Sequence, residues 1–91
     1  MSKVSLGFDF GTESVRVVVV DILSGRVLGQ AMDRYAHGVI SRSLPDSSDR
    51  LPDDFALQHP QDGLNSLSVA CKSAIQLSGV DVKNIVGIGV A

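Results

Sequence analysis

The sequence predicts an α/β fold: three antiparallel strands, a long helix and then a fourth strand. Three observations support this prediction. The runs 3–9 and 14–21 have the composition of strands, and the second is rich in valine. Apolar residues recur at helical spacing over 60–78, and an uninterrupted apolar run follows at 84–91. Because 91 residues are fewer than a typical domain contains, the chain forms one compact unit at most.

Two short turns account for the antiparallel arrangement of the first three strands. Phe10-Gly-Thr-Glu13 has a suitable length for a hairpin loop between the first two strands. Asp21-Ile-Leu-Ser-Gly25 is a second turn, in which Gly25 can adopt a positive φ. The chain can then return as a third strand over 26–33, which completes a meander.

Residues 33–59, called here the acidic excursion, differ in composition from the rest of the chain. From 33 to 62 there are six aspartates, three arginines and all three prolines, which indicates a long surface segment with at most short structure. Its central aspartates are Asp46, Asp49, Asp53 and Asp54. We expect a solvated acidic loop, while a cation site, a partner site and a dimer contact stay open.

The helix predicted over 60–78 begins with Pro60 and carries Asp62 in its first turn, as helix starts favour. His59 is expected to cap it, and Gly79 is expected to end it. The apolar stripe comprises Leu64, Leu67, Cys71, Ala74, Ile75 and Ser78. On this stripe Cys71 is expected to be an inert buried thiol. The chain's two histidines and this cysteine lack the spacing of a zinc site, and His37 receives no role.

Composition and charge exclude several classes of protein. With 44% hydrophobic and 20% charged residues, the chain is predicted to be globular rather than disordered. The net charge is −2 and no basic run occurs, so neither nucleic acid nor a membrane is an expected partner. A single cysteine and the absence of a signal peptide indicate a cytoplasmic protein. Because the chain stops inside an apolar strand, we expect it to be a fragment.

One segment near the start of the chain carries a candidate binding site. Its residues are Asp9, Gly11, Thr12, Glu13, Ser14 and Arg16. A strand brings the Asp9 carboxylate to its end, and the loop that follows offers backbone N–H groups and hydroxyls that can surround a phosphate. Asp9 is placed to hold Mg²⁺ through water, since this ion keeps part of its hydration shell and bridges phosphates. Arg16 can support Asp9 or approach the phosphates.

A structural interpretation of the same residues stays open, because Asp9 and Gly11 also occur in ordinary hairpin turns. Two common phosphate motifs are excluded. A Walker loop would end in Gly-Lys-Ser/Thr, and this ending is absent. A dinucleotide-binding motif would continue into a helix, whereas here a strand is predicted after the loop.

The segment Gly7-Phe-Asp-Phe-Gly-Thr-Glu-Ser-Val-Arg16, with the valine-rich strand that follows, resembles the first phosphate motif of the FGGY carbohydrate kinases. The resemblance continues at the helix start His59-Pro60 and in the strand 86–91. It implies that residues 1–91 are the N-terminal part of the first kinase domain. That domain has a ribonuclease-H-like fold with a mixed sheet, as in actin and hexokinase. The resemblance covers essentially the whole chain but only a small first part of such a kinase.

The resemblance implies ATP-dependent phosphorylation of a sugar or polyol. Tyr35-Ala-His-Gly-Val-Ile and the stretch 51–60 are most similar to the kinases of L-ribulose, so a ketopentose is the expected substrate. By the same resemblance Asp9 organises Mg²⁺, residues 11–14 lie at the β- and γ-phosphates of ATP, and Arg16 matches a common basic position. No catalytic residue is expected within this chain, because the base, the adenosine pocket and a second phosphate loop lie downstream in these kinases.

Three further expectations follow from this resemblance. The chain alone is expected to be inactive, and a homodimer of the full-length protein is left open. A different class of protein with the same fold is the alternative, namely a non-catalytic nucleotide-switch module like actin or the heat-shock chaperones. A third alternative is a truncated gene product without function. The helix start and the excursion favour the kinase.

Overall fold

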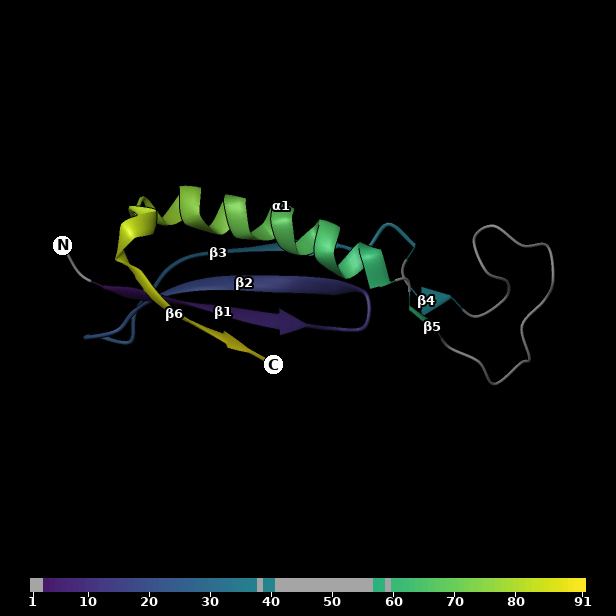
Figure 1. The fold of residues 1–91 in the computed structure, drawn as a ribbon, viewed down its shortest axis with the longest axis horizontal. Helices are drawn as coiled ribbons and strands as arrows, with labels where there is room; N and C mark the ends of the chain where they lie inside the picture. Colours follow the sequence, from purple (N-terminus) through teal and green to yellow (C-terminus); the bar gives the residue numbers. More distant parts are fainter. Residues whose placement is uncertain (1–2, 38, 41–56, 59) are drawn as a thin grey trace.

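The computed structural model describes residues 3–37, 39–40, 57–58 and 60–91, and within these ranges one long helix packs on one face of a four-stranded sheet (Figure 1). The sheet strands are β1 (Val4–Phe10), β2 (Ser14–Asp21), β3 (Val27–Arg34) and β6 (Ile85–Val90), and the helix is α1 (Pro60–Ser78). A separate two-stranded ladder joins β4 (Val39–Ile40) to β5 (Leu57–Gln58), and a short 3₁₀ helix covers Val82–Asn84. The predicted α/β class, with its mixed sheet and helix, is confirmed.

The strand order is β3-β2-β1-β6. The first three strands are antiparallel, with Asp9 opposite Arg16 and Phe10 opposite Val15. The last strand, β6, runs parallel to β1, and Gly7 pairs with Gly89. Because parallel neighbours end at the same edge of a sheet, the carboxyl ends of β1 and β6 lie side by side.

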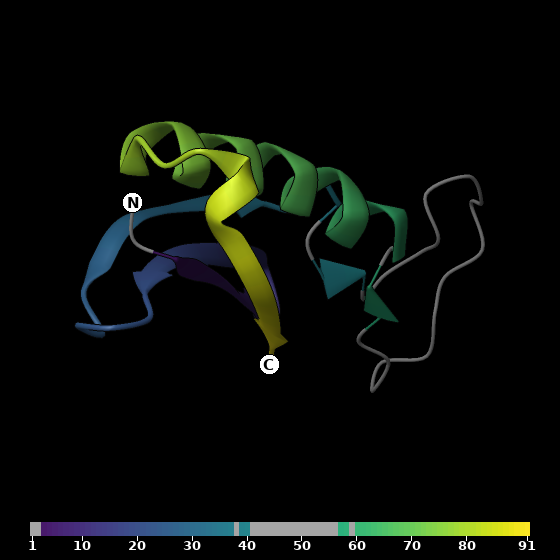
Figure 2. The same ribbon diagram turned by 60° about the vertical axis from the view of Figure 1, so that its left-hand side comes forward.

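The two faces of the sheet have different surroundings. Alternate residues of β1 and β2 point towards α1 and form the core, which contains Val4, Leu6, Val15, Val17, Val19, Tyr35, Ala70 and Ala74. The intervening residues, among them Asp9, Arg16 and Val18, point to the opposite face. No helix of the described residues covers that face, which is therefore called the open face (Figure 2).

Helix α1 approaches β3 closely because small residues meet at the contact. Its buried residues are Asp62, Ser66, Ala70 and Ala74, which follow one another at four-residue spacing. A Cβ atom at Gly29 would lie 2.7 Å from the Ala74 carbonyl oxygen. The predicted stripe was wrong in one respect, because Leu64 is 61% exposed. Leu67, Cys71 and Ile75 flank the contact and are half-buried, so the expected full burial of Cys71 is not observed.

The turn glycines have the expected conformations. Gly25 has φ 73°, and Gly79 has φ 70° and donates its N–H to the Ile75 carbonyl at 3.2 Å, which ends the helix. The helix covers the predicted residues, and β3 lies one residue later than predicted.

Most of the acidic excursion and the proposed cap His59 lie outside the described residues. The pairing of β4 with β5 joins the two ends of that stretch. None of the helices in the described ranges has the length and apolar character needed to cross a membrane.

Candidate phosphate-binding site

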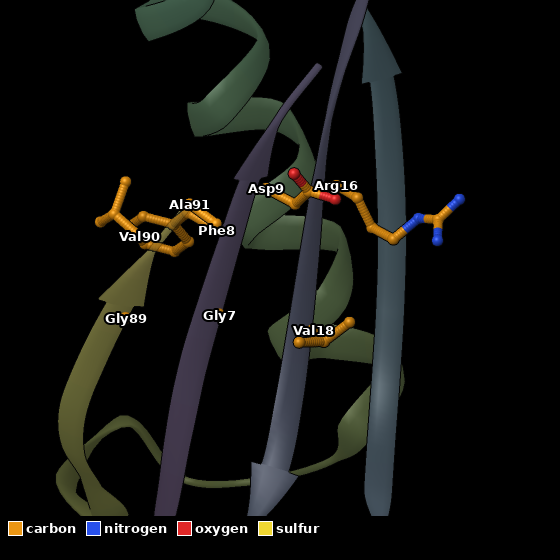
Figure 3. A pocket seen from close by; sticks show the side chains of 8 residues that line it. All are labelled: Gly7, Phe8, Asp9, Arg16, Val18, Gly89, Val90 and Ala91. Carbon is orange, nitrogen blue, oxygen red and sulfur yellow. The ribbon is translucent and has the colours of Figure 1, made fainter.

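The candidate site lies where β1 ends and the hairpin loop begins. Asp9 is exposed on the open face near the carboxyl end of β1. Arg16 is its direct partner on β2, so the two Cβ atoms are neighbours on the same face. Their charged groups nevertheless do not form an ion pair in the described part of the chain, and Figure 3 shows the guanidinium directed across β3, away from the carboxylate. The Asp9 carboxylate is accessible for a ligand or a cation.

A pocket of about 540 Å³ opens beside these two side chains (Figure 3). Its lining residues are Gly7, Phe8, Asp9, Arg16, Val18, Gly89, Val90 and Ala91. Two paired glycines, Gly7 on β1 and Gly89 on β6, leave its floor without side chains. The pairing of the two segments continues beyond the end of β6, where the Phe10 N–H donates to the Ala91 carbonyl at 3.1 Å. The pocket thus combines an uncrowded floor with the Asp9 carboxylate and is bordered by Arg16, whose guanidinium points away across β3.

The loop 11–13 is closed by one backbone hydrogen bond, from the Gly11 N–H to the Ser14 carbonyl at 2.8 Å. A Cβ at Gly11 would lie 3.2 Å from that carbonyl oxygen, so glycine provides the space that this closure needs. The Gly11 N–H is consequently engaged within the loop. In the described residues the Glu13 N–H has no hydrogen-bond partner, and Thr12 is exposed at the tip. The Glu13 amide is therefore available to an anion, while binding of phosphate by this loop stays a prediction.

The side chains of the loop differ in what they can contribute. Glu13 turns its carboxylate towards the end of β3, where it meets the Arg34 guanidinium at 3.3 Å. Both side chains are more than half exposed, so the pair adds less than about 1 kcal/mol to stability. The Ser14 side chain shares the open face with Arg16 by strand alternation, and is half-buried.

Tyr35 is a residue of this site to which the sequence analysis gave no role. It follows β3 directly and is 9% exposed. Its N–H donates to the Glu13 carbonyl at 2.9 Å, and its hydroxyl donates to the Gly11 carbonyl at 3.0 Å. Burial raises the pKa of the Tyr35 phenol above its ordinary value, and the Asp9 carboxylate raises it further. The phenol therefore stays protonated at neutral pH and donates permanently.

His37 and Asp62 form a second contact that the sequence analysis missed. The buried Asp62 carboxylate accepts the His37 backbone N–H at 2.7 Å and lies 2.9 Å from Nδ1 of the same residue. Ser66 adds a bond from its hydroxyl to the Arg34 carbonyl at 3.1 Å. The segment 34–37 is thereby attached to the first two turns of α1 on one side and to the loop on the other. Asp62, predicted only as a favourable charge at the helix start, is a side-chain acceptor.

The residues present suit Mg²⁺ held through water. No group of three or more potential metal ligands occurs in the described part of the chain, so a site formed by protein ligands alone is not found there. Mg²⁺ differs from most metals in needing only one or two carboxylates when phosphates and waters supply the other ligands. One accessible carboxylate, Asp9, beside a loop with an available amide matches that requirement.

Comparison with known proteins places the chain beside one group of enzymes. It is 38% identical over 90 residues to a ribulokinase of Shouchella clausii, 42% over 88 residues to one of Geobacillus thermodenitrificans and 41% over 88 residues to one of Mycolicibacterium smegmatis. These matches cover 96–99% of this chain and 15–16% of the relatives. The chain therefore spans about a sixth of the length of the curated relatives it matches. No protein-family model matches it.

The resemblance to the kinases of L-ribulose is thus confirmed as sequence similarity along nearly the whole chain. The structure brings Asp9, Arg16 and the loop 11–14 to one end of the sheet, as the sequence led us to expect. Whether these residues bind phosphate and Mg²⁺ stays a prediction.

Proposed function

We propose that this chain is part of a longer ATP-dependent sugar kinase whose substrate is a ketopentose, most specifically L-ribulose, which is converted to L-ribulose 5-phosphate. The observation that carries the proposal is the similarity to ribulokinases over nearly all of the chain. Within that enzyme the chain supplies the start of a ribonuclease-H-like domain. Its four-stranded mixed sheet with a helix on one face is compatible with this assignment.

The proposed role of the chain is to position the phosphates of ATP. Phosphoryl transfer needs mainly alignment and neutralisation of charge, because the reacting phosphoryl group spreads negative charge over its oxygens. Asp9 would hold Mg²⁺ through water beside the β- and γ-phosphates. The loop 11–14 would donate its amides and hydroxyls to them, and Arg16 would rotate towards them from the opposite strand. We assign the catalytic base to the remainder of the longer protein.

A nucleotide-switch module of the same fold would use the phosphate loop equally well. The kinase assignment is preferred because the similarity to ribulokinases includes the helix and the last strand as well as the loop. The open pocket with its paired glycines does not distinguish a kinase from a nucleotide-switch module.

The test is an assay of ADP release by the full-length protein that carries this sequence. L-Ribulose is compared with other ketopentoses, pentitols, glycerol and gluconate, in the presence of Mg²⁺ and after its removal by a chelator. We expect Mg²⁺-dependent release with L-ribulose as the best substrate. Activity confined to glycerol or gluconate would show that the substrate is wrong, and absence of any sugar-dependent release would overturn the kinase.

The isolated 91-residue chain serves as a second sample in the same assay. We expect no sugar-dependent ADP release from it, because it is proposed to hold only the phosphate side of the active site. Robust activity of the isolated chain would contradict that division of roles.

A further inference from the structure

We propose that Tyr35 is a positioning residue for the phosphate loop: its hydroxyl holds the Gly11 carbonyl and thereby leaves the amides of Glu13 and Ser14 available to a ligand. The inference rests on the proposed function in one respect, because the ligand of the loop is taken to be the phosphates of ATP. The residue itself does not touch the reacting atoms.

The hydrogen bonds of the loop carry the argument. A short hairpin loop is ordinarily closed by two bonds between its flanking residues, here Gly11 and Ser14. One of them is present, from the Gly11 N–H to the Ser14 carbonyl at 2.8 Å. The return bond, from the Ser14 N–H to the Gly11 carbonyl, is not formed in the described part of the chain. The Gly11 carbonyl instead accepts the Tyr35 hydroxyl at 3.0 Å.

The second bond from Tyr35 fixes the other end of the loop. Its N–H donates to the Glu13 carbonyl at 2.9 Å. In a trans peptide the N–H of the next residue points opposite to the carbonyl, so a held Glu13 carbonyl directs the Ser14 N–H away from Tyr35. The Glu13 N–H also has no partner within the described residues. Two adjacent amides are thus kept free by contacts made on the other side of the loop.

Tyr35 can act in this way because it is itself held firmly. Its side chain is in the core, and the residues beside it are bonded to α1 through Ser66 and Asp62. The hydrogen bond is part-buried and Gly11 itself is exposed, so losing the hydroxyl leaves the Gly11 carbonyl either open to water or free to close the hairpin. Either outcome lowers the affinity of the loop for an anion.

The test uses the full-length protein and the substitution Tyr35→Phe, with Ser78→Ala as the control. Each removes one part-buried hydroxyl that donates to a backbone carbonyl, at 3.0 Å and 2.7 Å respectively. Only the first acceptor is in the loop; the second is Ile75, in the last turns of α1. Two quantities are measured: the Kd of a non-hydrolysable ATP analogue with Mg²⁺ by calorimetry, and the KM values for ATP and L-ribulose.

We expect Tyr35→Phe to raise the Kd of the analogue and the KM for ATP about fivefold, the effect of one net hydrogen bond. The KM for L-ribulose should stay within twofold of the wild-type value. Ser78→Ala should lower the unfolding temperature and leave the Kd unchanged.

An unchanged Kd in Tyr35→Phe, or an equal change in both variants, would overturn the inference and assign Tyr35 a purely structural role. Failure of the proposed function can be told apart from failure of this inference. If the wild-type protein binds the ATP analogue but phosphorylates no sugar, the kinase assignment is wrong, and the comparison of Kd values still tests the role of Tyr35.

Discussion

The two faces of the sheet show how one pair of strands can form the core on one side and present the candidate site on the other. On the helix side, β1 and β2 present Val4, Leu6, Val15, Val17 and Val19, all of which are at most 4% exposed. On the open face the alternate positions are occupied by Ser5, Gly7, Asp9, Arg16 and Val18. Because side chains alternate along a strand, the buried set fixes the register and thereby places Asp9 opposite Arg16. The position of the site is therefore determined by the packing of the other face.

Replacing one glycine on each face by alanine should give the largest difference in stability between the two faces. We expect Gly29→Ala, on the helix side, to lower the free energy of unfolding of the full-length protein by about 3 kcal/mol, because the new Cβ would meet backbone atoms of α1 at 2.7 Å and 2.8 Å. On the open face, Gly7→Ala meets only a methyl group of Val18, at 2.9 Å, and this side chain can rotate. Its expected cost is below about 1 kcal/mol.

Urea unfolding of the two variants measures the comparison. Equal losses would mean that the open face is as tightly covered in the full-length protein as the helix side, and the contrast between the faces would then hold only for this segment.

Two neighbouring valines of β2 give a second comparison of the two faces, with a smaller expected effect on stability. Val17 is fully buried beneath α1, whereas its neighbour Val18 lines the pocket. We expect Val17→Ala to cost about 2 kcal/mol, since it removes two methyl groups from the core and leaves a cavity. Val18→Ala should cost less than about half of that. The order of the thermal unfolding midpoints checks this prediction, and an inverted order would contradict the assignment of the faces.

A difference between local and long-range contacts explains which features could be predicted from the sequence. Strand β2 and helix α1 were predicted residue for residue, because valine runs, Pro60 and Gly79 are local signals. The hairpin loop that follows Asp9 was located for the same reason. The contacts of Tyr35 and of His37 were missed because their partners lie 24 and 25 residues away, and only the register of β3 brings them together.

Leu64 is the opposite case. Its spacing in the sequence predicted burial, but the packing of α1 on β3 leaves it exposed. The helix approaches β3 through a row of small and polar residues, Asp62, Ser66, Ala70 and Ala74, so a leucine beside that row remains exposed. A tyrosine at a strand end and an acid in the first helical turn were the available signals of the missed contacts. Neither specifies a partner without the fold.

The last prediction separates binding from packing at a single position of the open face. Asp9→Asn keeps the shape of the side chain and removes its charge, and we expect kcat of the full-length enzyme to fall by about 10- to 100-fold, the usual range for a residue that acts on a metal through water. The Mg²⁺ concentration needed for half-maximal rate should rise as well. Stability should change little, because Asp9 is exposed and forms no ion pair within the described residues.

Asp21→Asn is the matched control for this variant, since it removes a carboxylate charge at the opposite end of the same hairpin. Asp21 accepts the Leu23 N–H at 2.9 Å, and an asparagine oxygen can accept that bond too. The control should therefore keep the wild-type rate and Mg²⁺ dependence. If kcat and the Mg²⁺ dependence of Asp9→Asn also stay at the wild-type values, Asp9 has no part in the site, and the open face at this end of the sheet is a surface whose charges serve solubility alone.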